Sequence, residues 1–104
     1  MYAVIFRSIR TADFEKLYQE HSVKMATLVK GINGYISHYS QRDPETREGV
    51  TVAYFESLES IKEWREHPEH KQTQELGRTH FYSWYEVQVV KIEREYDWAL
   101  PGSS

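Results

Sequence analysis

Two kinds of hydrophobic periodicity alternate along this chain of 104 residues, and their order limits the possible folds. Four segments are rich in β-branched and aromatic residues, and two place apolar residues at the three- and four-residue spacing of an amphipathic helix. They follow one another as strand, helix, strand, strand, helix, strand. This order predicts one α+β domain with helices on one face of an antiparallel sheet, the ferredoxin-like arrangement. The predicted strands span residues 2–8, 34–41, 49–56 and 81–98.

Polar residues, glycine and proline mark where the two helices begin and end. Thr11 is expected to cap the first helix, of about 18 residues, and Gly31 to close it in the left-handed conformation. Ser57 is expected to cap the second helix. Pro68 suits the first turn of a helix, so it predicts a new helical piece that ends at Gly77.

The last predicted strand is unusually long, and its apolar face changes along its length. Val87 and Val89 share one parity, whereas Val90 and Ile92 share the other. Either a β-bulge lies near Val89 and Val90, or the strand extends beyond its own sheet and finds a different neighbour.

Both faces of the predicted sheet are apolar. In the third strand, Val50, Val52 and Tyr54 alternate with Ala53 and Phe55. Only one face can meet the helices, and an uncovered apolar face is unusual for a monomer. Hydrophobic residues make up only 39% of the chain, so a second copy could complete the core. We therefore expect a two-fold homodimer with its sheets face to face.

Composition excludes several classes of protein. The net charge of −3 includes no basic stretch, which argues against nucleic-acid binding. No apolar run approaches the roughly 18 residues of a membrane span. The absence of cysteine excludes disulfides and thiol chemistry. With no secretory signal recognisable, a cytoplasmic location is expected, with one domain over residues 1–98 and a flexible tail over residues 99–104.

Several short motifs give the chain a family likeness over roughly residues 2–96. It resembles the antibiotic biosynthesis monooxygenase (ABM) domain family, a group of dimeric α+β barrels, near its heme-degrading and uncharacterised branches. The motifs that carry the resemblance are Gly34-Tyr35-Ile36, Tyr54-Phe55-Glu56-Ser57, Trp64, His67-Pro68, His70, Gly77-Arg78, Trp84-Tyr85 and Glu93-Arg94-Glu95-Tyr96.

The resemblance implies a monooxygenase acting on a small aromatic or quinone-type molecule without bound metal or flavin. In that chemistry the deprotonated substrate itself gives electrons to O₂. The protein then supplies a dry aromatic pocket, a proton acceptor and a group that stabilises an oxyanion.

Two alternatives stay open. Other members of the family bind and degrade heme, but the positions of their iron-ligating histidine and heme-contacting asparagine fall near Gln74 and Arg7 here. A heme site would therefore need His70 or His67 as the ligand. The second alternative is a non-enzymatic dimeric module for ligand binding or stress response.

Histidines are the candidates for the proton acceptor, because the pKa of imidazole lies near neutrality. His70 is the first candidate and His38 the second. His67 and His70 share a helix face and could bind metal with Glu63 or Glu66, although His67 could instead cap the helix at Pro68. No metal site is predicted, because no recognised ligand motif is present.

The remaining candidates would line a substrate pocket. His21 lies on the apolar face of the first helix, as a core residue or a pocket residue. Trp64 and Trp84 are either core or interface aromatics or the walls of a flat slot, and Tyr39 and His67 join them as binding candidates. His38 and Tyr39 lie on opposite faces of their strand, and a one-residue change of register would exchange those faces.

Overall fold

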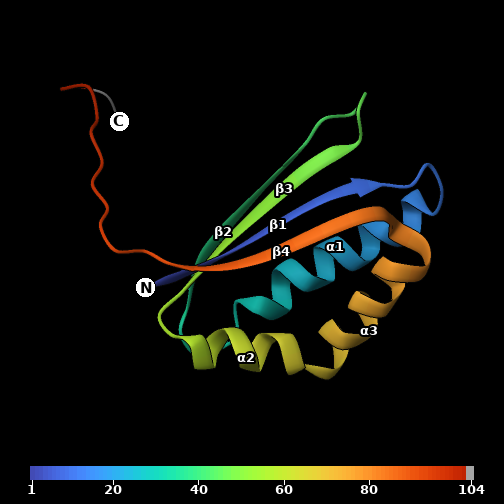
Figure 1. Cartoon of the computed structure of the whole chain (residues 1–104), viewed down its shortest axis with the longest axis horizontal. Helices are drawn as coiled ribbons and strands as arrows, with labels where there is room; N and C mark the ends of the chain where they lie inside the picture. The colour runs from blue at the N-terminus through green and yellow to red at the C-terminus, as the bar shows by residue number, and fades with distance from the viewer. Residues whose placement is uncertain (103–104) are drawn as a thin grey trace.

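A computed structural model describes residues 1–102 and shows a four-stranded antiparallel sheet with the helices against one face (Figure 1). The strand order is β2-β3-β1-β4, which confirms the predicted ferredoxin-like α+β fold. No helix of the described part is long and apolar enough to cross a membrane. The elements are β1 (Tyr2–Arg10), α1 (Glu15–Val29), β2 (Tyr35–Arg42), β3 (Glu48–Phe55), α2 (Leu58–Glu66), α3 (Pro68–Leu76), the π-helical turn η1 (Gly77–Phe81) and β4 (Tyr82–Lys91).

The strand register determines which side chains meet the helices. Val4 of β1 pairs with Ala53 on one side and with Val89 on the other, and Ala53 in turn pairs with His38. Val4 and Ala53 pack against the helix-side core, so this row faces the helices. Side chains alternate along a strand, so the neighbouring rows face outward.

The main core lies between the sheet and the helices. Phe55 is fully buried and clusters with Val29, Ile32 and Ile61. Trp64 of α2 packs against this cluster while remaining half-buried. The core therefore fixes α2 on the sheet and holds the indole of Trp64 at its edge.

Two of the predicted helix signals are confirmed. Ser57 caps α2, because its hydroxyl accepts a hydrogen bond from the Ser60 amide over 3.1 Å. Pro68 opens α3, and the Nδ1 atom of His67 accepts a hydrogen bond from the Glu69 amide over 3.2 Å. His67 is thus the cap of α3, which is one of the roles predicted for it.

The prediction that Thr11 caps the first helix is wrong. α1 begins at Glu15, after Phe14 adopts a left-handed conformation with φ of 62°. Thr11 instead donates from its hydroxyl to the His80 carbonyl over 2.8 Å and from its amide to the Phe81 carbonyl over 2.8 Å. These bonds to a distant segment join the end of β1 to η1, and they outweigh the local capping preference.

Of the two glycines predicted to close helices, Gly31 differs from the prediction. Gly31 lacks the left-handed conformation, which Gly34 adopts instead with φ of 93°. The backbone continues to wind past Gly31, because the Ile32 amide bonds to the Val29 carbonyl. This places Ile32 in the core, where it is 7% exposed. Gly77 is the C-cap of α3, which ends at Leu76 as predicted, and its φ of −57° lets the chain continue into the π-helical turn η1.

The last strand is shorter than predicted and has no bulge at Val89 and Val90. Its register with β1 stays regular there, and the one irregularity in this pairing lies between Ile9 and Arg10. β4 is apolar on both faces, which explains the apparent switch. Beyond Lys91 the chain leaves the sheet as an extended segment (Figure 1). That this segment finds a different neighbour stays a prediction. The predicted tail, residues 99–104, includes two residues, 103 and 104, outside the described part.

Replacing Gly34 by alanine should lower the free energy of unfolding by about 2 kcal/mol or more. A Cβ at Gly34 would collide with the Ser60 hydroxyl, which is buried, and the positive φ would strain any side chain. Gly31→Ala is the matched control. Its Cβ would only touch the Leu28 carbonyl oxygen at 3.4 Å, so the change should stay under about 1 kcal/mol. Equal effects of the two substitutions in urea unfolding would contradict this assignment.

Candidate active site

The register places His38 on the helix-facing side of β2. The pairing of β2 with β3 is irregular between Tyr35 and Ser37, which brings Tyr35 to the same side. The Tyr35 hydroxyl lies 2.6 Å from Nδ1 of His38. One nitrogen of His38 is therefore already engaged by a neighbour in its own strand.

Tyr39 and Trp84 lie on the opposite face of the sheet from His38. Tyr39 pairs with Val52 in an outward-facing row and is 55% exposed. Trp84 pairs with Ile9 and is 42% exposed, with the Arg7 guanidinium 5.6 Å from the centre of its ring. The sheet itself separates these two aromatics from the helix-side candidates.

Trp64 and His70 form the closest ring pair among the predicted site residues. Their rings are stacked, with centroids 4.0 Å apart and planes inclined by 13°. α2 ends at Glu66 and α3 begins at Pro68. The change of direction between the two helices brings the first turn of α3 close to the end of α2. The structure therefore brings together the first-choice histidine and the tryptophan that carried the family likeness.

The tautomer of neutral His70 follows from its contact with the main chain. Nδ1 lies 2.9 Å from the Trp64 carbonyl oxygen, which can only accept a hydrogen bond. The Gln74 amide nitrogen, a donor, also lies 3.2 Å from Nδ1, but the shorter contact to the carbonyl favours a proton on Nδ1. The lone pair of the neutral ring is then on Nε2. Within the described part of the chain, no residue hydrogen-bonds to that Nε2. His70 can accept a proton at Nε2 without breaking an existing contact.

Burial lowers the pKa of His70 below its ordinary value of 6.5. The bond to the Trp64 carbonyl opposes this shift, and the nearby charge of His67 adds to it. A lowered pKa keeps the imidazole neutral near pH 7. A general base must be neutral before it accepts a proton, so the environment of His70 favours that role.

His70 should also make folding stability depend on pH. Its pKa is lower when folded, so the unfolded chain binds more protons as the pH falls below about 6.5. The contribution of neutral His70 to the free energy of unfolding is therefore complete above pH 6.5, and it is lost as the pH falls through the folded-state pKa. We expect urea unfolding at pH 7.5 and pH 5.5 to differ less in His70→Gln than in the wild type. An unchanged difference would refute the lowered pKa.

His67 and His21 have structural partners. Nδ1 of His67 is occupied in capping α3, although its ring lies 5.8 Å from that of Trp64. Nδ1 of His21 lies 2.8 Å from the Thr73 hydroxyl and links α1 to α3. No group of three or more potential metal-ligating histidines or carboxylates occurs within residues 1–102.

The two positions implied by the heme-degrading branch lie apart. Gln74 follows His70 by one turn of α3, and its amide nitrogen lies 3.2 Å from Nδ1 of His70. Arg7 points to the outer face of the sheet and pairs with Glu86 at 3.6 Å. Neither residue offers the histidine or asparagine of that branch, so a heme site would need another ligand, and the Nε2 atom of His70 is the candidate beside Trp64.

Two cavities open at the end of the sheet where β2 and β3 form their hairpin, and no histidine lines either of them. The larger, of about 490 Å³, includes Arg7, Trp84 and Gly49 in its wall. The smaller, of about 390 Å³, lies beside the start of α1 and contains Arg10 and Arg47.

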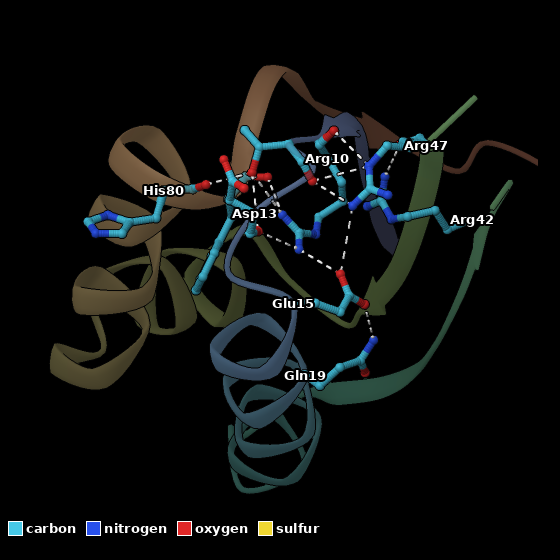
Figure 2. A network of polar contacts seen from close by, with 9 residues as sticks. Arg10, Asp13, Glu15, Gln19, Arg42, Arg47 and His80 are labelled. Atoms are coloured by element: carbon cyan, nitrogen blue, oxygen red, sulfur yellow. Dashed lines mark hydrogen bonds and ion pairs between the residues drawn. The ribbon is translucent and has the colours of Figure 1, made fainter. Parts of the chain in front are cut away.

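Sequence reasoning missed a cluster of three arginines at this end, which we call the arginine cluster: Arg10, Arg42 and Arg47. The Arg10 side chain is 1% exposed and forms an ion pair with Glu15 at 2.9 Å (Figure 2). Its guanidinium also donates to the Phe81 carbonyl over 2.6 Å and lies 4.0 Å from the centre of the Tyr18 ring. One feature of the sequence could have indicated a buried Arg10: it lies at the end of the first strand, at a position that alternates onto the same face as Val4, which meets the helices.

The fold and the stacked pair define a class first: a ferredoxin-like α+β protein with a histidine ring stacked on a half-buried tryptophan. The sequence profile of the antibiotic biosynthesis monooxygenase family matches residues 1–76. This chain therefore belongs to that family.

This chain is similar to known proteins in sequence and in fold. The uncharacterized protein YqjZ of Bacillus subtilis is 36% identical over 94 residues, which cover 90% of this chain and 81% of YqjZ. Rv0793 from Mycobacterium tuberculosis shares the fold with a TM-score of 0.79 at 19% identity, over 92% of this chain and 98% of its own. SnoaB from Streptomyces nogalater, a cofactor-independent oxygenase, shares it with a TM-score of 0.73 at 9% identity, over 90% of this chain and 95% of its own.

Proposed function

We propose that the chain is a monooxygenase that oxidises a small aromatic or quinone-type molecule without a bound metal or flavin. The observation that carries this proposal is the His70 imidazole stacked on Trp64, with Nδ1 bonded to a carbonyl and Nε2 open. Membership of the family and the fold shared with a cofactor-independent oxygenase support the same chemistry.

The proposed reaction begins with proton transfer from an acidic C–H of the substrate to Nε2 of His70. The resulting carbanion gives electrons to O₂, and a C–O bond forms to give a peroxide anion, which regains the proton from His70. The second C–H proton then leaves as the O–O bond breaks and hydroxide departs. The methylene group becomes a carbonyl, and the second oxygen atom leaves as water. The substrate supplies all the electrons.

Trp64 would bind the planar substrate. Its indole is half-buried against the core and already stacks on one flat ring, so its surroundings favour aromatic stacking. The indole also shields His70 from water, which contributes to the low pKa of that histidine.

Anthrone is a suitable probe, because its methylene group is acidic and its oxidation gives a carbonyl at the same carbon. We expect the protein to accelerate O₂ uptake by anthrone above the rate in buffer, and expect turnover to stop in anaerobic solution. Undiminished turnover without O₂ would refute the oxygenase proposal.

Heme is the second candidate, favoured by the same open nitrogen. A histidine whose Nδ1 donates to a carbonyl presents Nε2 to a metal in a fixed direction. Titration with hemin separates the two candidates. A Soret shift that saturates at one hemin per chain and disappears in His70→Ala would favour heme, whereas no shift would exclude it.

The proposed assembly is a homodimer formed through the outer face of the sheet. That face carries Ile5, Val52 and Tyr39 in one row, and Trp84 and Val90 on β4, with the last two 42% and 37% exposed. The segment beyond Lys91 could reach the partner, since Tyr96 and Trp98 on it are 89% and 77% exposed. Sedimentation equilibrium should give twice the mass of one chain.

A further inference from the structure

The smaller cavity at the hairpin end of the sheet lies apart from the Trp64–His70 pair and is strongly charged. Its wall includes all three members of the arginine cluster and two carboxylates, Glu15 and Asp43. Three guanidinium groups against two carboxylates leave one positive charge in the wall. Its volume of about 390 Å³ is within the range of small-molecule sites.

Arg42 is the member of the cluster without an acidic partner. No carboxylate lies within ion-pair distance of it in the described part of the chain, although it is only partly exposed. One terminal nitrogen donates to the carbonyls of Ser8 and Arg47, and the other donates to the Ser8 hydroxyl over 2.8 Å. The second hydrogen on that nitrogen, and Nε, make no contact within residues 1–102.

The position of Arg42 depends on Gly49, its partner across the hairpin. A Cβ at Gly49 would lie 2.5 Å from the guanidinium carbon of Arg42, so only glycine leaves room for it. The guanidinium also lies 5.9 Å and 6.0 Å from the ring centres of Tyr18 and Tyr82. Arg42 is therefore held in place before any anion arrives.

The two carboxylates in the cavity wall have different partners: one binds backbone amides and the other binds arginines. Asp43 accepts the amides of Glu45 and Thr46 through Oδ1 and so forms the hairpin turn. Glu15 reaches across the cavity to Arg10 at 2.9 Å and to Arg47 at 3.7 Å, although its side chain is 59% exposed (Figure 2). An exposed carboxylate on these arginines occupies the place that an external anion would take.

We propose that this cavity binds a small organic carboxylate through Arg42 and Arg47, with Glu15 as an internal competitor. The planar guanidinium matches a carboxylate in a two-point contact. Tyr18 and Pro44 give the wall an apolar part that suits a flat ring beside the carboxylate. This site is independent of the proposed oxygenase site.

Benzoate is the probe, and benzamide is its uncharged equivalent of nearly the same shape. By NMR titration we expect the wild type to bind benzoate, with shifts at Arg42 and Arg47, and to bind benzamide at least about tenfold more weakly. Arg42→Gln should weaken benzoate binding by about tenfold or more. Glu15→Gln should tighten it by about threefold, a gain that loss of folding cannot produce.

Other outcomes would overturn the proposal. Equal affinity for benzoate and benzamide would show that the arginines do not recognise the charge. Binding of inorganic phosphate but not benzoate would show an anion site of another class. Unchanged affinity in Glu15→Gln, with its fold confirmed by circular dichroism, would remove the competitor role.

Discussion

Replacing His70 by alanine is expected to lower kcat for aerobic oxidation of anthrone by about 10²- to 10⁴-fold, the usual loss when a general base is removed. The variant keeps Trp64 and the core beneath it, so substrate binding should change less than kcat. The remaining rate should also lose the acidic limb of its pH profile, because that limb reports protonation of Nε2. Steady-state O₂ uptake between pH 5 and pH 8 measures both effects.

His80→Ala is the matched control for this substitution. The His80 ring packs on Phe14 and lies 2.7 Å from the Thr79 hydroxyl, away from Trp64. His80→Ala also removes an imidazole, but kcat should stay within about threefold of the wild-type value. An equal loss in the two variants would assign the effect to stability. No loss in either would show that His70 is not the proton acceptor.

Replacing Arg10 by alanine should produce the largest loss of stability among the polar residues discussed, about 3 kcal/mol in the free energy of unfolding. The substitution removes one of the two donors to the Phe81 carbonyl, the closer of the two partners of Glu15 and the cation against the Tyr18 ring. These contacts connect β1 to α1 and to the end of η1, so their loss should loosen that end of the sheet.

Arg7→Ala tests whether burial causes this effect. Arg7 lies three residues earlier in the same strand, but its side chain is 60% exposed and its ion pair with Glu86 is 3.6 Å long. Its removal should cost less than about 1 kcal/mol. Urea unfolding of both variants gives the comparison, and equal losses would contradict the structural role of Arg10.

The fold could be predicted from local pattern because each element has its own periodicity. The hairpin between β2 and β3, the Ser57 cap and the start of a new helix at Pro68 all depend on residues close together in sequence. The beginning of α1 could not be predicted in this way. Thr11 has good local capping chemistry, but its hydrogen bonds go to η1, 69 residues away.

In the candidate site, too, contacts between residues close in sequence could be predicted, and contacts between distant residues could not. Trp64 and His70 are six residues apart, so sequence reasoning could place them on adjoining helical turns. The faces of His38 and Tyr39 needed the strand register, which an irregularity at Tyr35 modifies. The arginine cluster was missed because its members come from β1, β2 and the following turn, and only the folded sheet brings them together.

We propose that this chain inserts one oxygen atom from O₂ into an aromatic substrate with His70 as the proton acceptor. Oxidation of anthrone under ¹⁸O₂, followed by mass spectrometry of the anthraquinone, tests it most directly. We expect one ¹⁸O atom in the product, formed at a rate that depends on the protein and falls in His70→Ala. Unlabelled product, or equal rates of labelled product with the protein, with the variant and in buffer, would contradict the claim.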